Sequence, residues 1–318
     1  MFLYNKPIRN NILLFRVILF ILGCFKMYKI SNFTNNDDVT IIAEKGPFQV
    51  IQYKRDLSVS PSTAMTAYFC DEMNIRKRQV ICDLSKSNGI TCQAGAMQWT
   101  VGNVNATTGV KGAGDFLGKL VKGKVTGESA IKPEYVGDGT LVLEPTYRHI
   151  VLLDTSEWNG KVVLDDGLFL ACDASIKQKL VARSNVSSAV LGGEGLFNLA
   201  LQGNGIAVLE CRCPQEELIE ITLENDVLKV DGSFAIAWSD SLNFTVERSG
   251  KTLIGSAASG EGFVNVYRGT GKVLLAPVDS TIGGFPVSST APSAPASAGS
   301  KTAGALGSLL GGIADALD

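Results

Sequence analysis

The chain has 318 residues and a formal net charge of −2, and charged residues make up 19% of it. This near-neutral balance disfavours a nucleic-acid surface, and a folded core of about 250 residues can bury a large apolar interior in one domain. The seven cysteines are an odd number in a long chain, which disfavours a disulfide framework.

Residues 1–26 differ from the rest because they contain no Asp, Glu, Ser, Thr, Ala or Gln. Three interpretations compete: upstream sequence read before a start at Met27, a signal-anchor over Ile12–Phe25, or a lipoprotein signal that ends at Cys24. The apolar stretch is interrupted by Arg16 and is shorter than the roughly 20 residues that span a bilayer. We expect a cytoplasmic protein, with a membrane anchor through residues 1–26 as the alternative.

The central part of the chain repeats one pattern three times, in Val125–Pro145, Leu191–Cys211 and Ala258–Pro277. Each copy has Gly-Glu and a small residue, an apolar stretch, Gly-x-Gly, and a run rich in valine and leucine. A period this regular indicates one structural unit used three times.

The second copy illustrates the predicted unit, because Leu196–Leu201 and Ile206–Leu209 flank Gly203-Asn204-Gly205. Glycines tolerate positive φ, so the pattern predicts a β-hairpin. Further hairpin turns are predicted where Asp-Gly or Asn-Gly precedes an apolar run. They are Asp165-Asp166-Gly167, Val230-Asp231-Gly232 and, as a first copy, Ser87-Asn88-Gly89.

These units predict an all-β domain over residues 27–280, with three repeats and few helices. Closure around a pseudo-threefold axis would leave no open sheet edge. Short helices are expected only at Phe116–Val121, at Ser187–Leu191 and near the C-terminus. Residues 281–302, rich in Ser, Ala and Pro, predict a linker.

Residues 303–318 predict a short helix, because apolar residues fall there at helical spacing. The helix is a candidate contact with a partner or a membrane, and the alternative is that it folds back on its own domain. The contact residues would be Leu306, Leu310, Ile313 and Leu317.

Several motifs together resemble the altered-inheritance-of-mitochondria twenty-four family: MYKI at Met27, Gly112–Ser129, Gly137–Pro145, and the two later repeats. The resemblance covers Met27–Pro277. It implies a double-stranded β-helix with pseudo-threefold symmetry, similar to the tryptophan RNA-binding attenuation protein. It implies no catalytic residues. Fungal mitochondrial members are associated with inner-membrane organisation, so the resemblance implies scaffold or membrane work by analogy.

The best candidate constellation for chemistry is Glu128, Glu194 and Glu261, one from each repeat. If they converge on the axis, their carboxylates could bind a hard cation. The alternative is that each glutamate accepts backbone N–H bonds at the same turn of its repeat. A cation- or small-molecule-binding protein is therefore the alternative function.

A second candidate contact is Phe116, Leu117 and Leu120, which lie among glycines and lysines. They would dock on a membrane surface or a partner, unless they form a helix packed over one end of the domain. No P-loop and no G-x-S-x-G motif is present, and we expect His149 and the pair Cys211 and Cys213 to be structural.

The sequence therefore predicts a non-catalytic scaffold or binding module without a cofactor. Its expected partner is an unknown protein or a membrane surface, and self-association into a homo-oligomer stays open.

Overall fold

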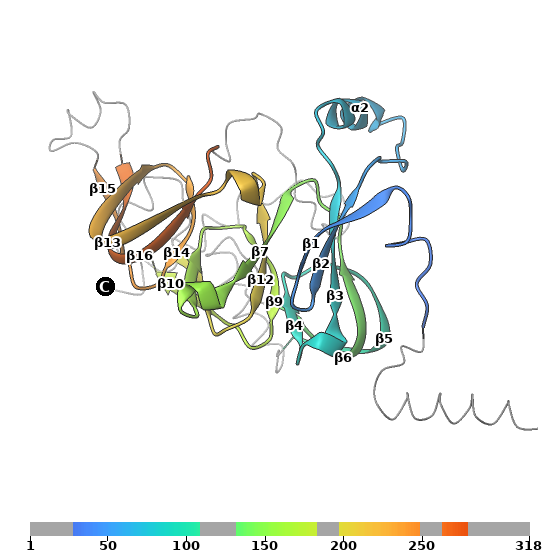
Figure 1. Cartoon of the computed structure of the whole chain (residues 1–318), viewed down its shortest axis with the longest axis horizontal. Helices are drawn as coiled ribbons and strands as arrows, with labels where there is room; N and C mark the ends of the chain where they lie inside the picture. The colour runs from blue at the N-terminus through green and yellow to red at the C-terminus, as the bar shows by residue number, and fades with distance from the viewer. Residues whose placement is uncertain (1–27, 109–131, 183–196, 249–262, 279–318) are drawn as a thin grey trace, which may run out of the picture. The chain divides into compact units, whose positions relative to one another are not determined.

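The computed structural model describes residues 28–108, 132–182, 197–248 and 263–278, all within the compact unit Met1–Gly283 (Figure 1). Strands dominate these residues, so the predicted all-β class is confirmed at that level. The strands are β1 (Val39–Lys45), β2 (Phe48–Tyr53), β3 (Arg78–Asp83), β4 (Ile90–Cys92), β5 (Met97–Thr107), β6 (Glu134–Leu143), β7 (His149–Asp154), β8 (Lys161–Leu164), β9 (Phe169–Asp173), β10 (Lys177–Ala182), β11 (Phe197–Gln202), β12 (Ile206–Cys211), β13 (Ile219–Asp231), β14 (Ala235–Ser239), β15 (Asn243–Arg248) and β16 (Phe263–Leu275).

Helical structure is sparse in the same residues. It comprises the α-helix α2 (Ala64–Glu72) and the 3-10 turns η1 (Leu84–Lys86), η2 (Thr155–Trp158) and η3 (Gln215–Glu217). The helices that the sequence predicts at Phe116–Val121, at Ser187–Leu191 and near the C-terminus lie outside the described residues.

The strands form two antiparallel sheets. The first has the order β1-β2-β3-β6-β4-β9-β12-β7, with β5 also paired to β6. The second has the order β10-β11-β8-β14-β16-β13, with β15 also paired to β16. Antiparallel pairing throughout fits short strands joined by tight connections.

The two sheets share a hydrophobic core. Strand β7 shows how, because its successive side chains point to opposite faces. Val151 and Leu153 belong to a cluster that also contains Leu164 and Leu201 of the second sheet. The alternate residues Ile150 and Leu152 belong to a separate cluster within the first sheet. Both faces of β7 are therefore covered, which explains its uninterrupted apolar sequence.

The predicted hairpin around Gly203-Asn204-Gly205 is wrong. Strand β11 pairs with β10 and β8, whereas β12 pairs with β7 and β9, so this segment carries the chain from one sheet to the other. The third copy is also no hairpin, because Phe263–Leu275 is one continuous strand. The physical reason lies in the glycine backbone. Gly203 and Gly269 have φ of +130° and +120°, far from the roughly +60° of left-handed turn residues.

The Asp-Gly hairpins are wrong for a related reason. Gly167 has φ of +74° and does turn the chain, but β8 before it and β9 after it belong to different sheets. Gly232 separates β13 from β14, and each pairs with β16 rather than with the other. Tight glycine turns are therefore present, but they connect strands whose hydrogen-bond partners lie elsewhere in the chain.

Strands β15 and β16 carry a bidentate ion pair. Arg268 Nη1 and Nη2 donate to the two carboxylate oxygens of Glu247 at 2.5 and 2.9 Å. These hydrogen bonds lower the pKa of Glu247 to about 2. Both side chains are partly exposed, so solvent weakens the pair.

This ion pair predicts a pH dependence of stability. Since the pKa of Glu247 is lower in the folded state, its contribution is present above about pH 4.5 and is lost as the pH falls toward about 2. We expect Glu247→Gln to flatten this part of the stability profile, measured by urea unfolding at several pH values. Equal slopes for the variant and the wild type would contradict the prediction.

Candidate functional site: a pocket beneath an exposed helix

The helix α2 lies between β2 and β3 in the chain and outside both sheets (Figure 1). None of its residues is buried, although it carries Met65, Tyr68 and Phe69. It ends at Glu72; Asn74, two residues further on, has a left-handed φ of +57°, and Ile75 N donates to Cys70 O at 2.8 Å. An apolar helix is thus held at the surface.

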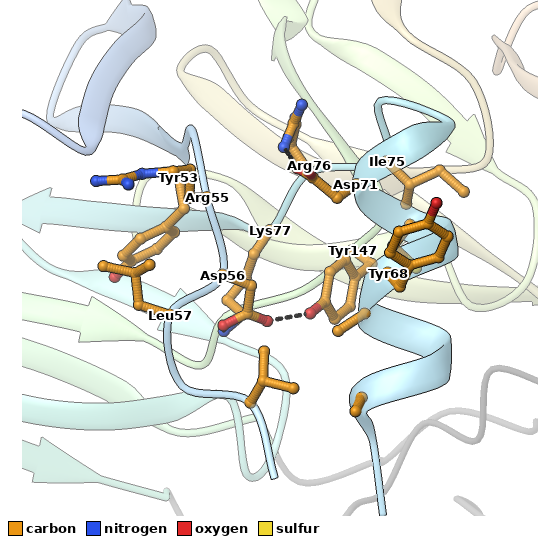
Figure 2. A pocket seen from close by; sticks show the side chains of 14 residues that line it. Tyr53, Arg55, Asp56, Leu57, Tyr68, Asp71, Ile75, Arg76, Lys77 and Tyr147 are labelled. Carbon is orange, nitrogen blue, oxygen red and sulfur yellow. Dashed lines mark hydrogen bonds and ion pairs between the residues drawn. The ribbon is translucent and has the colours of Figure 1, made fainter. Parts of the chain in front are cut away.

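A pocket of about 310 Å³ opens between α2 and the segment that follows β2. The side of α2 that lines it presents Ala64 and Ala67, whose short side chains leave the space unfilled. Tyr68 and Ile75 extend the same apolar wall, and Leu57 lies across from them (Figure 2). The walls of the pocket are therefore mainly apolar.

The floor of the pocket is a polar network around Asp56 (Figure 2). Tyr147 OH donates a short hydrogen bond to one carboxylate oxygen, and Lys77 Nζ lies 2.9 Å from the other. The same ammonium lies over the rings of Tyr53 and Tyr147, 5.7 and 6.0 Å from their centroids. This network ties the segment after β2 to the residue before β3 and to the residues before β7.

The protonation states of this network are fixed. Partial burial acts to raise the pKa of Asp56, but the hydrogen bonds from Tyr147 and Lys77 outweigh it and lower that pKa. Burial and the Asp56 carboxylate raise the pKa of Tyr147 well above its usual value. Near neutral pH the carboxylate stays ionised and the phenol stays protonated, so neither is tuned for proton transfer.

The cations around the pocket are all paired. Arg55 donates to both carboxylate oxygens of Asp38, at 2.7 and 2.8 Å. Arg76 pairs with Asp71 and also donates to Lys54 O at 2.7 Å. Together with the pair of Lys77 and Asp56, these contacts neutralise the three cations that line the pocket.

The site residues that the sequence predicts lie outside the described residues, so they stay predictions. They are Glu128, Glu194, Glu261, Phe116, Leu117, Leu120, Leu306, Leu310, Ile313 and Leu317. Among the described residues, no group of three or more His, Cys, Asp or Glu side chains could hold a metal ion.

Of the remaining sequence candidates, Cys211 and Cys213 are buried and His149 is partly exposed. Cys211 ends β12, and burial raises the pKa of its thiol to about 12, so the thiol is unreactive near neutral pH. His149 begins β7 opposite Cys211, and burial together with Arg78 lowers its pKa. Both environments agree with the structural roles expected from the sequence.

Sequence reasoning missed the pocket beneath α2. One signal was available, because the chain carries no charged residue between Asp56 and Asp71 yet contains Leu57, Met65 and Phe69. A surface segment of this length without charge is uncommon in a soluble domain.

No helix within the described ranges has the length and hydrophobicity needed to cross a membrane. The chain is similar to an uncharacterised protein of Streptococcus pyogenes serotype M6, with 32% identity over 201 residues that cover 61% of this chain and 78% of the relative. A crystal structure of another Streptococcus pyogenes protein, SPYM3_0169, shares 27% identity with a TM-score of 0.48, and the match covers 64% of this chain and 89% of that one. The family model described as mitochondrial biogenesis AIM24 matches residues 73–278, so the chain belongs to the AIM24 family.

Proposed function

We propose that this protein is a non-catalytic binding module, and that the pocket beneath α2 receives an uncharged, apolar segment of a partner protein. The observation that carries the proposal is the combination of apolar walls with cations that are already paired. Leu57, Ala67 and Ile75 offer apolar contact. Tyrosine rings with hydroxyl groups add the few polar contacts that orient a ligand in such sites.

The charges favour a protein segment over a lipid surface. Helices that bind membrane interfaces are rich in Lys and Arg, whereas α2 has neither and ends with Asp71 and Glu72. Arg55, Arg76 and Lys77 would have to leave their carboxylate partners before they could hold an anionic headgroup. An uncharged peptide needs no such exchange.

The floor of the pocket supports a non-catalytic role. Nucleophilic or acid–base catalysis needs a group whose pKa lies near the working pH. Both pKa values are shifted away from that range, in opposite directions. Burial acts to raise the pKa of Asp56, but its hydrogen bonds from Tyr147 and Lys77 outweigh burial and lower it, whereas burial and the hydrogen bond to Asp56 raise the pKa of Tyr147. The pair is suited to holding the pocket open.

We further propose that the β domain is built from three similar units in a double-stranded β-helix. Gly137, Gly203 and Gly269 are regularly spaced and have φ of +123°, +130° and +120°. The strand pairs β5–β6, β10–β11 and β15–β16 are antiparallel. Gly137 and Gly269 lie within the second strand of their pairs, β6 and β16, and Gly203 directly follows β11. Glu128, Glu194 and Glu261 each fall in the sequence between the two strands of one of these pairs, which supports their equivalence.

A pocket-filling substitution tests the function. Peptides selected from a random displayed library against the full chain should carry an uncharged apolar core. We expect Ala67→Phe, which fills the pocket, to weaken their binding about tenfold or more, measured by calorimetry. The matched control is Thr66→Phe, which adds the same ring to α2 at a residue that does not line the pocket. Its affinity should equal that of the wild type.

Salt separates the competing functions. We expect peptide affinity to change little between about 0.05 and 0.3 M NaCl, because the pocket offers no unpaired cation. Selection of acidic peptides with steep salt dependence, or binding to phosphatidylglycerol vesicles that Ala67→Phe abolishes, would contradict the proposal. A melting temperature that calcium raises in the wild type but not in Glu194→Ala would support the cation-binding alternative.

A further inference from the structure

The stability of α2 is not explained by its own contacts. Helices shorter than about 12 residues are marginal in water unless a face packs against something. α2 has nine residues and none is buried. Thr63 makes no side-chain cap, the first turn has no acidic residue, and the last turn has no basic one. Packing of its exposed side against another surface would stabilise such a helix.

The outward side of α2 is an apolar stripe made of Met65, Phe69 and Met73. Their exposed fractions are 75%, 58% and 72%. Residues four apart lie on one side of a helix, so the three side chains form a continuous row. None of them lines the pocket, which lies against Ala64, Ala67 and Tyr68 instead. The stripe is thus a second surface, separate from the pocket.

We propose that the stripe pairs with the stripe of a second copy of this chain, with the two helices antiparallel about a twofold axis. The row reads methionine, phenylalanine, methionine, so it is symmetric about Phe69. An antiparallel pair places Phe69 against Phe69 of the partner and Met65 against Met73 of the partner. A twofold interface needs this kind of self-complementary surface, and flexible methionines adapt well to it.

The charges of α2 favour the antiparallel direction. Asp71 and Glu72 lie at the C-terminal end, where the helix dipole is negative and acidic groups are unfavourable. An antiparallel partner brings its N-terminal end, where the dipole is positive, toward these residues. The first turn of α2 has no acidic residue, so no like charges meet there. A parallel pair would instead place the acidic ends side by side.

The interface is small, so the dimer should be weak. Stable protein interfaces bury about 1,200 Å² or more in total, and a row of three exposed side chains on each of two nine-residue helices is smaller than that, so the contact belongs to the weak, transient class. We therefore expect a reversible dimer whose dissociation constant is in the micromolar range. The proposal concerns the outer side of α2 and stands independently of the ligand of the pocket.

Sedimentation velocity of the full chain over a range of concentrations tests the dimer. We expect the wild type to shift from monomer to dimer, and Phe69→Ala to stay monomeric at concentrations where the wild type is mostly dimer. Ile219→Ala is the control, because Ile219 is a large apolar side chain on β13 that is 50% exposed. A wild type that is monomeric throughout, or a dimer that survives Phe69→Ala, would overturn the proposal.

Cross-linking tests the direction of the helices. In a background with Cys24→Ser and Cys70→Ser, chains with Met65→Cys and chains with Met73→Cys are mixed and oxidised. An antiparallel pair forms disulfides mainly between the two kinds of chain, whereas either kind alone forms few. Preferential links between identical chains would indicate parallel helices and overturn the assignment. Binding of the wild type to neutral vesicles without dimerisation would show that a lipid surface covers the stripe.

Discussion

Replacing Gly203 by alanine is expected to destabilise the protein by about 2–5 kcal/mol, whereas the same change at Gly269 should cost about 1–3 kcal/mol. Both glycines have positive φ, +130° and +120°, so both alanines would be strained. They differ in the space that a Cβ would enter. At Gly203 it would lie 2.5 Å from Ser175 O and 3.3 Å from Ile176 Cα, while at Gly269 the nearest atom is 3.8 Å away.

Comparing the two variants separates the effect of backbone strain, which both share, from the effect of the close contact between Gly203 and Ser175, which only the first has. Ser175 lies in the short connection between β9 and β10, so the clash would push the crossover at Gly203 away from that connection. Denaturant unfolding followed by circular dichroism measures both free energies, and an unchanged m-value would show that the variants still unfold as the wild type does. If the two substitutions had the same cost, the contact with Ser175 would contribute nothing, and backbone strain alone would explain the loss of stability.

The sequence predicted that these glycines have positive φ, but it did not predict which strands they connect. The even spacing of Gly137, Gly203 and Gly269 correctly indicated positions with special backbone geometry. The sequence could not tell a turn residue from a bend or a crossover, because Gly-x-Gly permits all three. The role of each glycine depends on which strands pair with each other. Strand β11 pairs with β10 and β8, and these pairings are not encoded in the residues around the glycine.

The helix α2 was not predicted because apolar residues lie on several of its sides, so one apolar face does not stand out against a polar one. Alanine, methionine, tyrosine and phenylalanine surround it, so the periodicity that marks a helix packed on a core is weak. Its position follows from its flanks, where β2 and β3 pair with each other and leave the intervening residues to loop outward. The pairing of β2 with β3 fixes the positions of the two ends of the segment that contains α2.

The polar floor of the pocket could not be predicted because Tyr147 is distant in the chain from the other lining residues, which lie within residues 53–77. Tyr147 reaches Asp56 only because Arg78 at the start of β3 pairs with Thr146 across an isolated bridge. The residues that flank Asp56 and Tyr147 in the sequence give no sign that the two side chains are in contact. The predicted glutamates were chosen by repetition alone, and repetition identifies equivalent positions without showing that they meet.

Leu201→Ala is expected to destabilise the protein by about 2–5 kcal/mol, because it opens a cavity where the two sheets share a core. Leu201 is fully buried on β11 and is paired with Val162 of β8 in the second sheet. It belongs to the same cluster as Leu209 of β12, which lies in the first sheet beyond the crossover at Gly203. The lost methyl groups therefore weaken the contact between sheets as well as the packing within one.

The control is Leu180→Ala on the neighbouring strand β10, where the side chain is 42% exposed. Its cost should be below about 1 kcal/mol, since surface substitutions away from special features change stability little. Urea unfolding of both variants, followed by tryptophan fluorescence, measures the difference. Trp158 belongs to the shared core and Trp238 to a cluster of the second sheet, so one transition seen by both would show that the sheets unfold together. Two transitions in Leu201→Ala would mean that this leucine is what couples the sheets into a cooperative unit.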